Sequence, residues 1–155
     1  MFEDSLKEGG MGEHTVWNLL TDSEKNPKIR FVFDVRKDKN YQAKDIDFLV
    51  ENTNRQITPF EVKTDMQAHK TGNIVYEKTT SNHVGCFEKT QAHIIAYYIP
   101  GNQQVHMIRV SALRKYVQES KLSEVRMGDN ATGYLLPIED LKNNGVILKT
   151  FEGVM

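Results

Sequence analysis

The sequence lacks the usual marks of secreted, disulfide-bonded and membrane-spanning proteins. Its single cysteine, Cys86, cannot form a disulfide within the chain, and the closely spaced Cys and His pairs of a structural zinc site are absent. No uninterrupted apolar run approaches the ~18 residues of a membrane span. The first residues are acidic rather than basic and lead into no apolar stretch. We therefore expect no signal peptide and a cytoplasmic location.

The sequence also lacks a large excess of either charge. Its 20 Lys and Arg residues against 21 Asp and Glu residues give a formal charge of -1. This balance argues against a protein whose whole surface coats nucleic acid, although local charge could still serve that purpose. A chain of 155 residues with 39% hydrophobic and 26% charged residues is typical of one globular domain, which we expect to span residues 1–155.

Hydrophobic periodicity predicts a helix, three strands, an irregular or helical segment, two strands and a helix, in that order. The first helix should begin near Met11, after the Gly9-Gly10 pair, and end near Asp22. In the first strand, the alternating apolar residues from Ile29 to Val35 should share one face, with Phe31 and Phe33 among them.

The later segments complete an α/β pattern. The nearly continuous apolar run His93–Ile99 is typical of a strand covered on both faces. The expected strands cover residues 29–35, 45–50, 57–64, 93–99 and 105–110, with strand-like segments at 73–77 and 134–136; the expected helices cover 11–22, 112–119 and 138–142, with a short one near 84–92. We predict a central mixed β-sheet that begins as an antiparallel meander and is flanked by helices.

Two carboxylates and a lysine on consecutive predicted strands form the strongest local pattern. Successive strand residues point to opposite faces, so Glu61 and Lys63 should emerge together when Phe60 and Val62 enter the core. Asp47 lies on the preceding strand of the same hairpin, and pairing can bring its carboxylate across from or diagonal to Glu61. The three charged groups should therefore share one patch.

Such a patch suits a divalent metal. Mg²⁺ and Mn²⁺ prefer carboxylate oxygens and leave positions open for water and a phosphate oxygen. Lys63 could then position or help to deprotonate the nucleophile and offset charge that develops on the phosphate. The alternative is that these residues form only the solvated face of a hairpin, where opposite charges at i and i+2 stabilise each other weakly.

The pattern Asp47, then Glu61-Val62-Lys63 after a turn, resembles the D…(D/E)-x-K signature of the PD-(D/E)XK nuclease superfamily, which has the restriction-endonuclease-like fold. The wider segments Tyr41–Val50, Phe60–Asp65 and Thr71–Ile74 resemble small phage-type and Holliday-junction-resolvase-like members. The resemblance extends from about Met11 to Ile99 and includes the order of helix and strands. Its core motif is short, so its specificity comes from that order.

The resemblance implies a role for each matching residue. Asp47 and Glu61 would hold Mg²⁺ or Mn²⁺, the backbone carbonyl of Val62 would be a further ligand, and Lys63 would be the catalytic lysine. Glu13 matches an additional acid that many members place near the metal, with an exposed helix acid as the alternative. Asp45 should share the face of Asp47, and the resemblance favours Asp47 as the ligand.

The implied activity is metal-dependent hydrolysis of DNA phosphodiesters by an endonuclease of repair, recombination or phage DNA processing. With little room for a separate recognition domain, the chain should read DNA structure rather than a long sequence, and cutting both strands makes a homodimer plausible. A non-catalytic DNA- or protein-binding module on the same fold is the alternative. Candidates for site-lining or DNA contact are Gln42, Lys70, Thr71, Asn73, Lys78, Ser81, Asn82 and Lys89.

Overall fold

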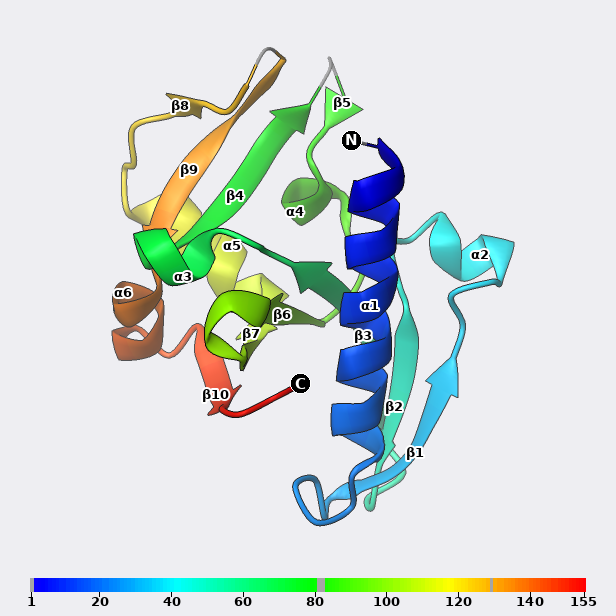
Figure 1. The fold of residues 1–155 in the computed structure, drawn as a ribbon. Coiled ribbons are helices and arrows are strands. Elements are labelled where there is room, and N and C mark those ends of the chain that lie inside the picture. The colour runs from blue at the N-terminus through cyan, green and yellow to red at the C-terminus, as the bar shows by residue number, and fades with distance from the viewer. Residues whose placement is uncertain (1, 81–82, 129) are drawn as a thin grey trace.

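The computed structural model describes residues 2–80, 83–128 and 130–155, and it consists of two β-sheets with helices packed around them (Figure 1). The strands are β1 (Ile29–Asp34), β2 (Phe48–Asn52), β3 (Ile57–Thr64), β4 (Asn73–Thr80), β5 (His83–Val84), β6 (Ile94–Ile99), β7 (Gln104–Arg109), β8 (Val125–Arg126), β9 (Ala131–Pro137) and β10 (Ile147–Phe151). The helices are α1 (Phe2–Thr21), α2 (Lys39–Gln42), α3 (Ala68–Thr71), α4 (Cys86–Lys89), α5 (Val110–Glu119) and α6 (Ile138–Asn143), with a 3₁₀ helix at Pro100–Asn102.

The larger sheet confirms the predicted mixed α/β architecture. Its six strands follow the order β1-β2-β3-β6-β7-β10, in which β3 and β6 run parallel and the other neighbours run antiparallel. The first three strands form the expected meander. The segments predicted at 134–136 and 138–142 correspond to β9 and α6.

A second, four-stranded antiparallel sheet was not foreseen as a separate layer. Its strand order is β5-β4-β9-β8, and its principal pair joins β4 to β9 over most of their length. The segment expected as a short strand at 73–77 is the first part of the longer β4. Pairing between strands so distant in the chain leaves no local pattern in the sequence, which explains the difference.

Helix α1 lies across one face of the larger sheet (Figure 1). Val16, Leu19 and Leu20 pack there against a cluster that includes Phe48 and Phe60. The helix begins at Phe2, nine residues before Met11, where the Gly9-Gly10 pair had led us to expect its start. Glycine costs a helix only about 1 kcal/mol per residue relative to alanine, so the Gly9-Gly10 pair alone does not end the helix.

The opposite face of the larger sheet is covered over only part of its width. Ile95 and Ile108 pack against residues of the second sheet, α5 and α6, including Leu136, Leu113 and Leu141. None of the helices in the described ranges combines the length and apolar composition needed to cross a membrane.

The predicted inward face of β1 was wrong. An irregularity in pairing between Ile29 and Phe31 shifts the register, after which Val32 lies opposite Val50. Ile29 and Val32 therefore both pack on the α1 side, whereas Phe31 and Phe33 keep 51% and 45% of their surface exposed. A one-residue bulge reverses the face, and alternation alone could not reveal it.

Candidate active site

The β2–β3 hairpin brings Asp47 and Glu61 together. Phe48 pairs with Phe60, and the Asp47 N–H donates to the Phe60 carbonyl at 2.8 Å, so extending the register by one residue places Asp47 opposite Glu61. The Asp47 carboxylate also accepts a 2.7 Å hydrogen bond from the backbone N–H of Val62 through Oδ2. Asp47 is thereby fixed at the entrance of β2, beside the strand that carries the motif.

Glu61 and Lys63 share a face of β3, as alternation predicts, and form an ion pair. The Lys63 Nζ lies 2.8 Å from Glu61 Oε1. Glu61 is only 5% exposed, and its second oxygen, Oε2, is buried with no hydrogen-bond partner among the described residues. A buried carboxylate oxygen without a donor is costly, and it marks a position where a cation or a proton would be stabilised.

Glu13 approaches the same site from α1. Its Oε1 lies 3.5 Å from the Arg36 guanidinium, which also pairs with Asp34 at 2.7 Å. The preceding residue, Gly12, lets the helix come very close to β3, since a Cβ at this position would lie 1.8 Å from Thr64 Oγ1. The absence of a side chain at Gly12 therefore sets the distance at which Glu13 faces the sheet.

Burial and like charges control the ionisation of Asp47. Burial is the main cause that raises the pKa of this carboxyl to about 7, and the charges of Glu13 and Glu61 raise it further. The Val62 N–H and the Lys63 ammonium act in the opposite direction. Asp47 thus interacts with two other carboxylates, and the pair Asp47–Glu61 favours the uptake of positive charge.

Lys63 and Glu61 respond to the same surroundings. Burial raises the pKa of Glu61, against the lowering effect of Lys63. For Lys63, burial opposes the charged form, but the Glu61 carboxylate overcomes it and the pKa is raised. Lys63 is therefore protonated at neutral pH, which suits a role in stabilising negative charge rather than in removing a proton.

Asp45 lies in a turn and not in the predicted strand. Its backbone is left-handed, with φ of 57°, and its carboxylate lies 3.8 Å from the Lys89 ammonium. The negative charge of Asp45 contributes to the raised pKa of Glu61. The Thr90 hydroxyl donates to the Asp45 carbonyl at 3.3 Å. The turn therefore brings Asp45 near Glu61, and the alternation predicted along a strand does not apply to Asp45.

The number and the environment of the carboxylates decide whether Asp47 and Glu61 suit a divalent metal ion. Within the described ranges, no three Asp, Glu, His or Cys side chains converge to form a ready-made metal cage. Mg²⁺ commonly binds one or two carboxylates and completes its coordination with water and substrate phosphate. Asp47 and Glu61, with the unpartnered Oε2 and raised carboxyl pKa values, fit that type of site.

A cleft of about 380 Å³ is lined in part by Lys63. Asp65, Cys86 and Tyr97 also line it, and the Tyr97 hydroxyl donates to Asp65 Oδ2. Burial raises the pKa of the Cys86 thiol, so the thiolate is disfavoured. This environment is typical of a structural rather than a reactive cysteine.

Sequence reasoning missed the residue that holds the segment around Cys86 and Thr90. The Arg114 guanidinium, on α5, donates to the backbone carbonyls of Phe87, Glu88 and Thr90 at 2.7 to 3.2 Å. These carbonyls lie at the end of α4, where a helix leaves acceptors unpaired. No local pattern could have identified Arg114, because its partners lie 24 to 27 residues away.

The predicted DNA-contact residues do not converge. Figure 1 shows α3, which carries Lys70 and Thr71 and precedes Asn73, on the opposite side of the molecule from α2, where Gln42 donates to the Arg36 carbonyl at 2.7 Å. Lys78 forms a 2.6 Å ion pair with Glu124, whereas Lys89 lies beside Asp45. Ser81 and Asn82 lie outside the described residues. Contact of these side chains with DNA stays a prediction.

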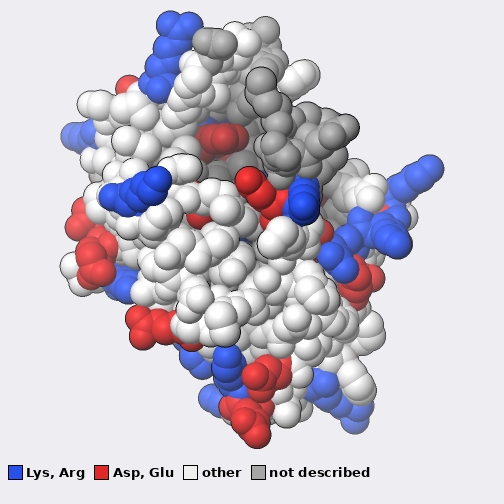
Figure 2. All heavy atoms as spheres, in the orientation of Figure 1, with Lys and Arg blue, Asp and Glu red and all other residues white. Residues whose placement is uncertain are grey.

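Charge is mixed over the surface in view. Figure 2 shows Lys and Arg interspersed with Asp and Glu over most of this face, with a group of basic side chains at its right-hand edge. The formal charge of -1 is thus distributed rather than segregated there.

Comparison with known proteins finds a similar fold in a nuclease. No family model matches the sequence, and neither does any curated protein. Among solved structures, the chain is similar to a bacterial homing endonuclease, I-Ssp6803I, with a TM-score of 0.51 and 13% identity over 72% of this chain and 73% of that one. The two chains share a fold, which agrees with the nuclease-like architecture expected from the sequence.

Proposed function

We propose that the protein is a divalent-metal-dependent DNA endonuclease that hydrolyses phosphodiester bonds at the β2–β3 hairpin. The observation that carries this proposal is the buried pair Asp47–Glu61 beside Lys63, in which Glu61 Oε2 has no described partner and Lys63 lies 2.8 Å from Oε1. The likeness to a homing endonuclease supports a nuclease through the fold. The D…(D/E)-x-K pattern supports membership of the PD-(D/E)XK superfamily.

Asp47 and Glu61 would hold Mg²⁺ or Mn²⁺, with the Val62 carbonyl as a further ligand and Glu13 nearby. When bound, the ion supplies Lewis-acid stabilisation of the phosphate and activates water. Between pH 4 and 7 the Asp47 carboxyl holds a proton, which a metal ion would have to displace. We therefore expect metal binding to release a proton and to strengthen as the pH rises through 7.

Lys63 would stabilise the charge that grows on the phosphate oxygens during the reaction. Its ammonium is held by Glu61 and is partly accessible, with 29% of its side chain exposed. A fixed cation in a partly desolvated site stabilises such charge far better than one in bulk water. Because its pKa is raised, Lys63 supplies this field throughout the neutral pH range.

A homodimer would place two such sites on one duplex and permit cleavage of both strands. The short chain leaves recognition to DNA structure, such as a branch or a nick, rather than to a long sequence. The biological setting that we infer is repair, recombination or phage DNA processing.

Cleavage of branched, nicked and linear DNA in Mg²⁺, Mn²⁺ or EDTA tests the proposal. The wild type should cut at least one substrate in either metal and none in EDTA. Asp47→Asn should lose cleavage, whereas Asp140→Asn, an exposed control on α6, should retain it. Equal cleavage by wild type and Asp47→Asn would overturn the site. DNA binding without cleavage under all conditions would instead favour a non-catalytic module.

A further inference from the structure

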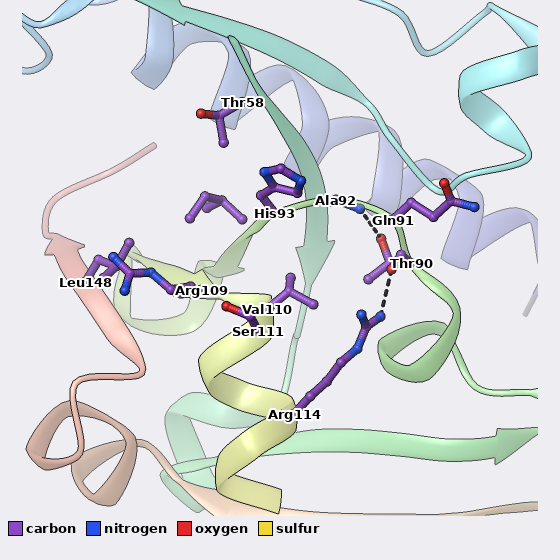
Figure 3. A pocket seen from close by; sticks show the side chains of 11 residues that line it. Thr58, Thr90, Gln91, Ala92, His93, Arg109, Val110, Ser111, Arg114 and Leu148 are labelled. Carbon is purple, nitrogen blue, oxygen red and sulfur yellow. Dashed lines mark hydrogen bonds between the residues drawn. The ribbon is translucent and has the colours of Figure 1, made fainter. Parts of the chain in front are cut away.

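A second cleft, of about 570 Å³, lies where β6 begins, β7 ends and α5 begins (Figure 3). The polar side chains of Thr90, His93, Arg109, Ser111 and Arg114 line it. Among the described residues that form its wall, none is acidic. In a chain with as many acids as bases, a cleft with two guanidinium groups and no carboxylate is a local concentration of positive charge.

The two arginines of the cleft differ in how they are held. The Arg114 guanidinium is fixed against the carbonyls that end α4, and Figure 3 shows it directed at the Thr90 segment. Arg109 is exposed, and its guanidinium has no hydrogen-bond or ion-pair partner among the described residues. Arg114 therefore contributes a fixed charge, and Arg109 has donors available for a ligand.

The cleft is close to the candidate active site along the chain. Thr90 lines the cleft and also donates to the carbonyl of Asp45, whose charge acts on Glu61. Ile94 lines the cleft as well, and the next residue, Ile95, pairs directly with Glu61 in the parallel β3–β6 ladder. His93 immediately precedes β6. Successive strand residues point to opposite faces, so Ile94 and its partner Arg109 lie on the face of the sheet opposite to Ile95 and Glu61.

We infer that this cleft binds a phosphate of the DNA backbone, with Arg109 as its principal donor. The inference rests on the proposed function. Phosphate oxygens are anionic acceptors, and an available guanidinium can bind them in a bidentate manner. The Ser111 hydroxyl and the His93 ring add donors in the same wall. Such a contact fixes the position of the backbone and reads no sequence.

Binding of a labelled linear duplex over a range of salt concentrations tests the inference. Neutralising one phosphate contributes about 0.9 to the slope of log K against log salt. Arg109→Ala should weaken binding about three- to tenfold and reduce the slope by about one contact. Lys115→Ala removes the same charge from an exposed position of α5 outside the cleft, and it should leave the slope unchanged.

Cleavage kinetics supply the second readout. Because Arg109 would contact substrate away from the reacting phosphate, Arg109→Ala should raise KM more than it lowers kcat, and Arg109→Lys should restore part of the loss. Identical slopes and KM values for Arg109→Ala and Lys115→Ala, with a wild type that cuts DNA, would overturn the inference alone. A wild type that neither binds nor cuts DNA would overturn the proposed function and the inference with it.

Discussion

Strands β3 and β6 are parallel neighbours, yet their side chains on the same face differ completely. Glu61 lies beside Ile95, and Lys63 lies beside Tyr97. Ile95 is fully buried and packs in the core between the two sheets, whereas the paired position on β3 holds a carboxylate that is also buried. On one strand the position stabilises the fold, and on its neighbour it carries an ionisable group.

The difference indicates that the buried carboxylate on β3 lowers the stability of the fold. A buried apolar side chain contributes roughly 1.5 to 3 kcal/mol to folding, whereas a buried carboxylate lowers stability unless it is paired. Glu61 pairs with Lys63 through Oε1, and its Oε2 is buried without a hydrogen-bond partner among the described residues. Features that break the local rules for packing are expected mainly at functional sites. The predictions below test this contrast between the charged and the packed strand.

The largest effect is expected at Lys63. Lys63→Ala should lower the rate of DNA cleavage by about 100- to 1000-fold, the typical cost of losing one electrostatic contact to a transition state. Lys115→Ala on the exposed side of α5 serves as the control and should cut at the wild-type rate. Single-turnover cleavage measures both. Equal cleavage rates for Lys63→Ala and Lys115→Ala would show that Lys63 takes no part in the reaction.

Asp47→Asn should stabilise the protein while it abolishes cleavage. The pKa of Asp47 is about 7 in the folded protein against an ordinary value of 3.8, so the folded chain binds more protons than the unfolded chain between these values. Stability contributed by this group is therefore lost as the pH rises from about 4 to 7. At pH 8 the variant should be more stable by up to about 4 kcal/mol, and at pH 4 by close to nothing.

Urea unfolding of wild type and Asp47→Asn at the two pH values measures this difference. Asp140→Asn is the control and should follow the wild type at both. A variant that is less stable than the wild type at pH 8 would contradict the raised pKa of Asp47.

Ile95→Ala should produce the opposite pattern on the packed strand. Removing this fully buried side chain should lower the free energy of unfolding by about 2 to 5 kcal/mol. Phe33→Ala, on the exposed face of β1, should cost about 1 kcal/mol or less. Both variants should keep the wild-type kcat under conditions where they are folded. A similar loss of stability in Ile95→Ala and Phe33→Ala would contradict the exposed position of Phe33 on β1.

The packed half has its own buried ionisable group, with the opposite pH dependence. His106 is fully buried, bonds Thr150 Oγ1 through Nδ1 at 2.8 Å and has no described partner for Nε2. Burial lowers its pKa to about 4 from 6.5, so the unfolded chain binds more protons between these values. Its contribution, about 3 kcal/mol at neutral pH, is lost as the pH falls through this window.

His106 and Asp47 therefore oppose each other between pH 4 and 6.5. The wild type should show a shallow dependence of stability on pH in this range. In Asp47→Asn the free energy of unfolding should fall as the pH is lowered, and in His106→Gln it should rise. Urea unfolding at several pH values tests the pair, and a dependence that neither variant changes would contradict both assignments.

The sequence predicted the hairpin and its charged residues because these depend on local patterns. Alternation placed Glu61 and Lys63 on one face, and the short turn brought Asp47 to Glu61. The reversal of Phe31 and Phe33 was not predictable, because it depends on a bulge that alternation does not reveal. Thr90 and Arg114 reach the site through contacts between distant segments, for which the sequence holds no periodic signal.

Cleavage of a DNA duplex by Glu61→Gln, beside Glu51→Gln, tests the central claim most directly. Both substitutions remove a β2–β3 carboxylate, but Glu51 pairs with Arg30 at 3.0 Å, at the far end of the hairpin from Asp47. In Mg²⁺ or Mn²⁺ we predict that Glu51→Gln cuts like the wild type and that Glu61→Gln loses at least about 100-fold in rate. Cleavage by Glu61→Gln at the wild-type rate would contradict the assignment of this hairpin as the active site.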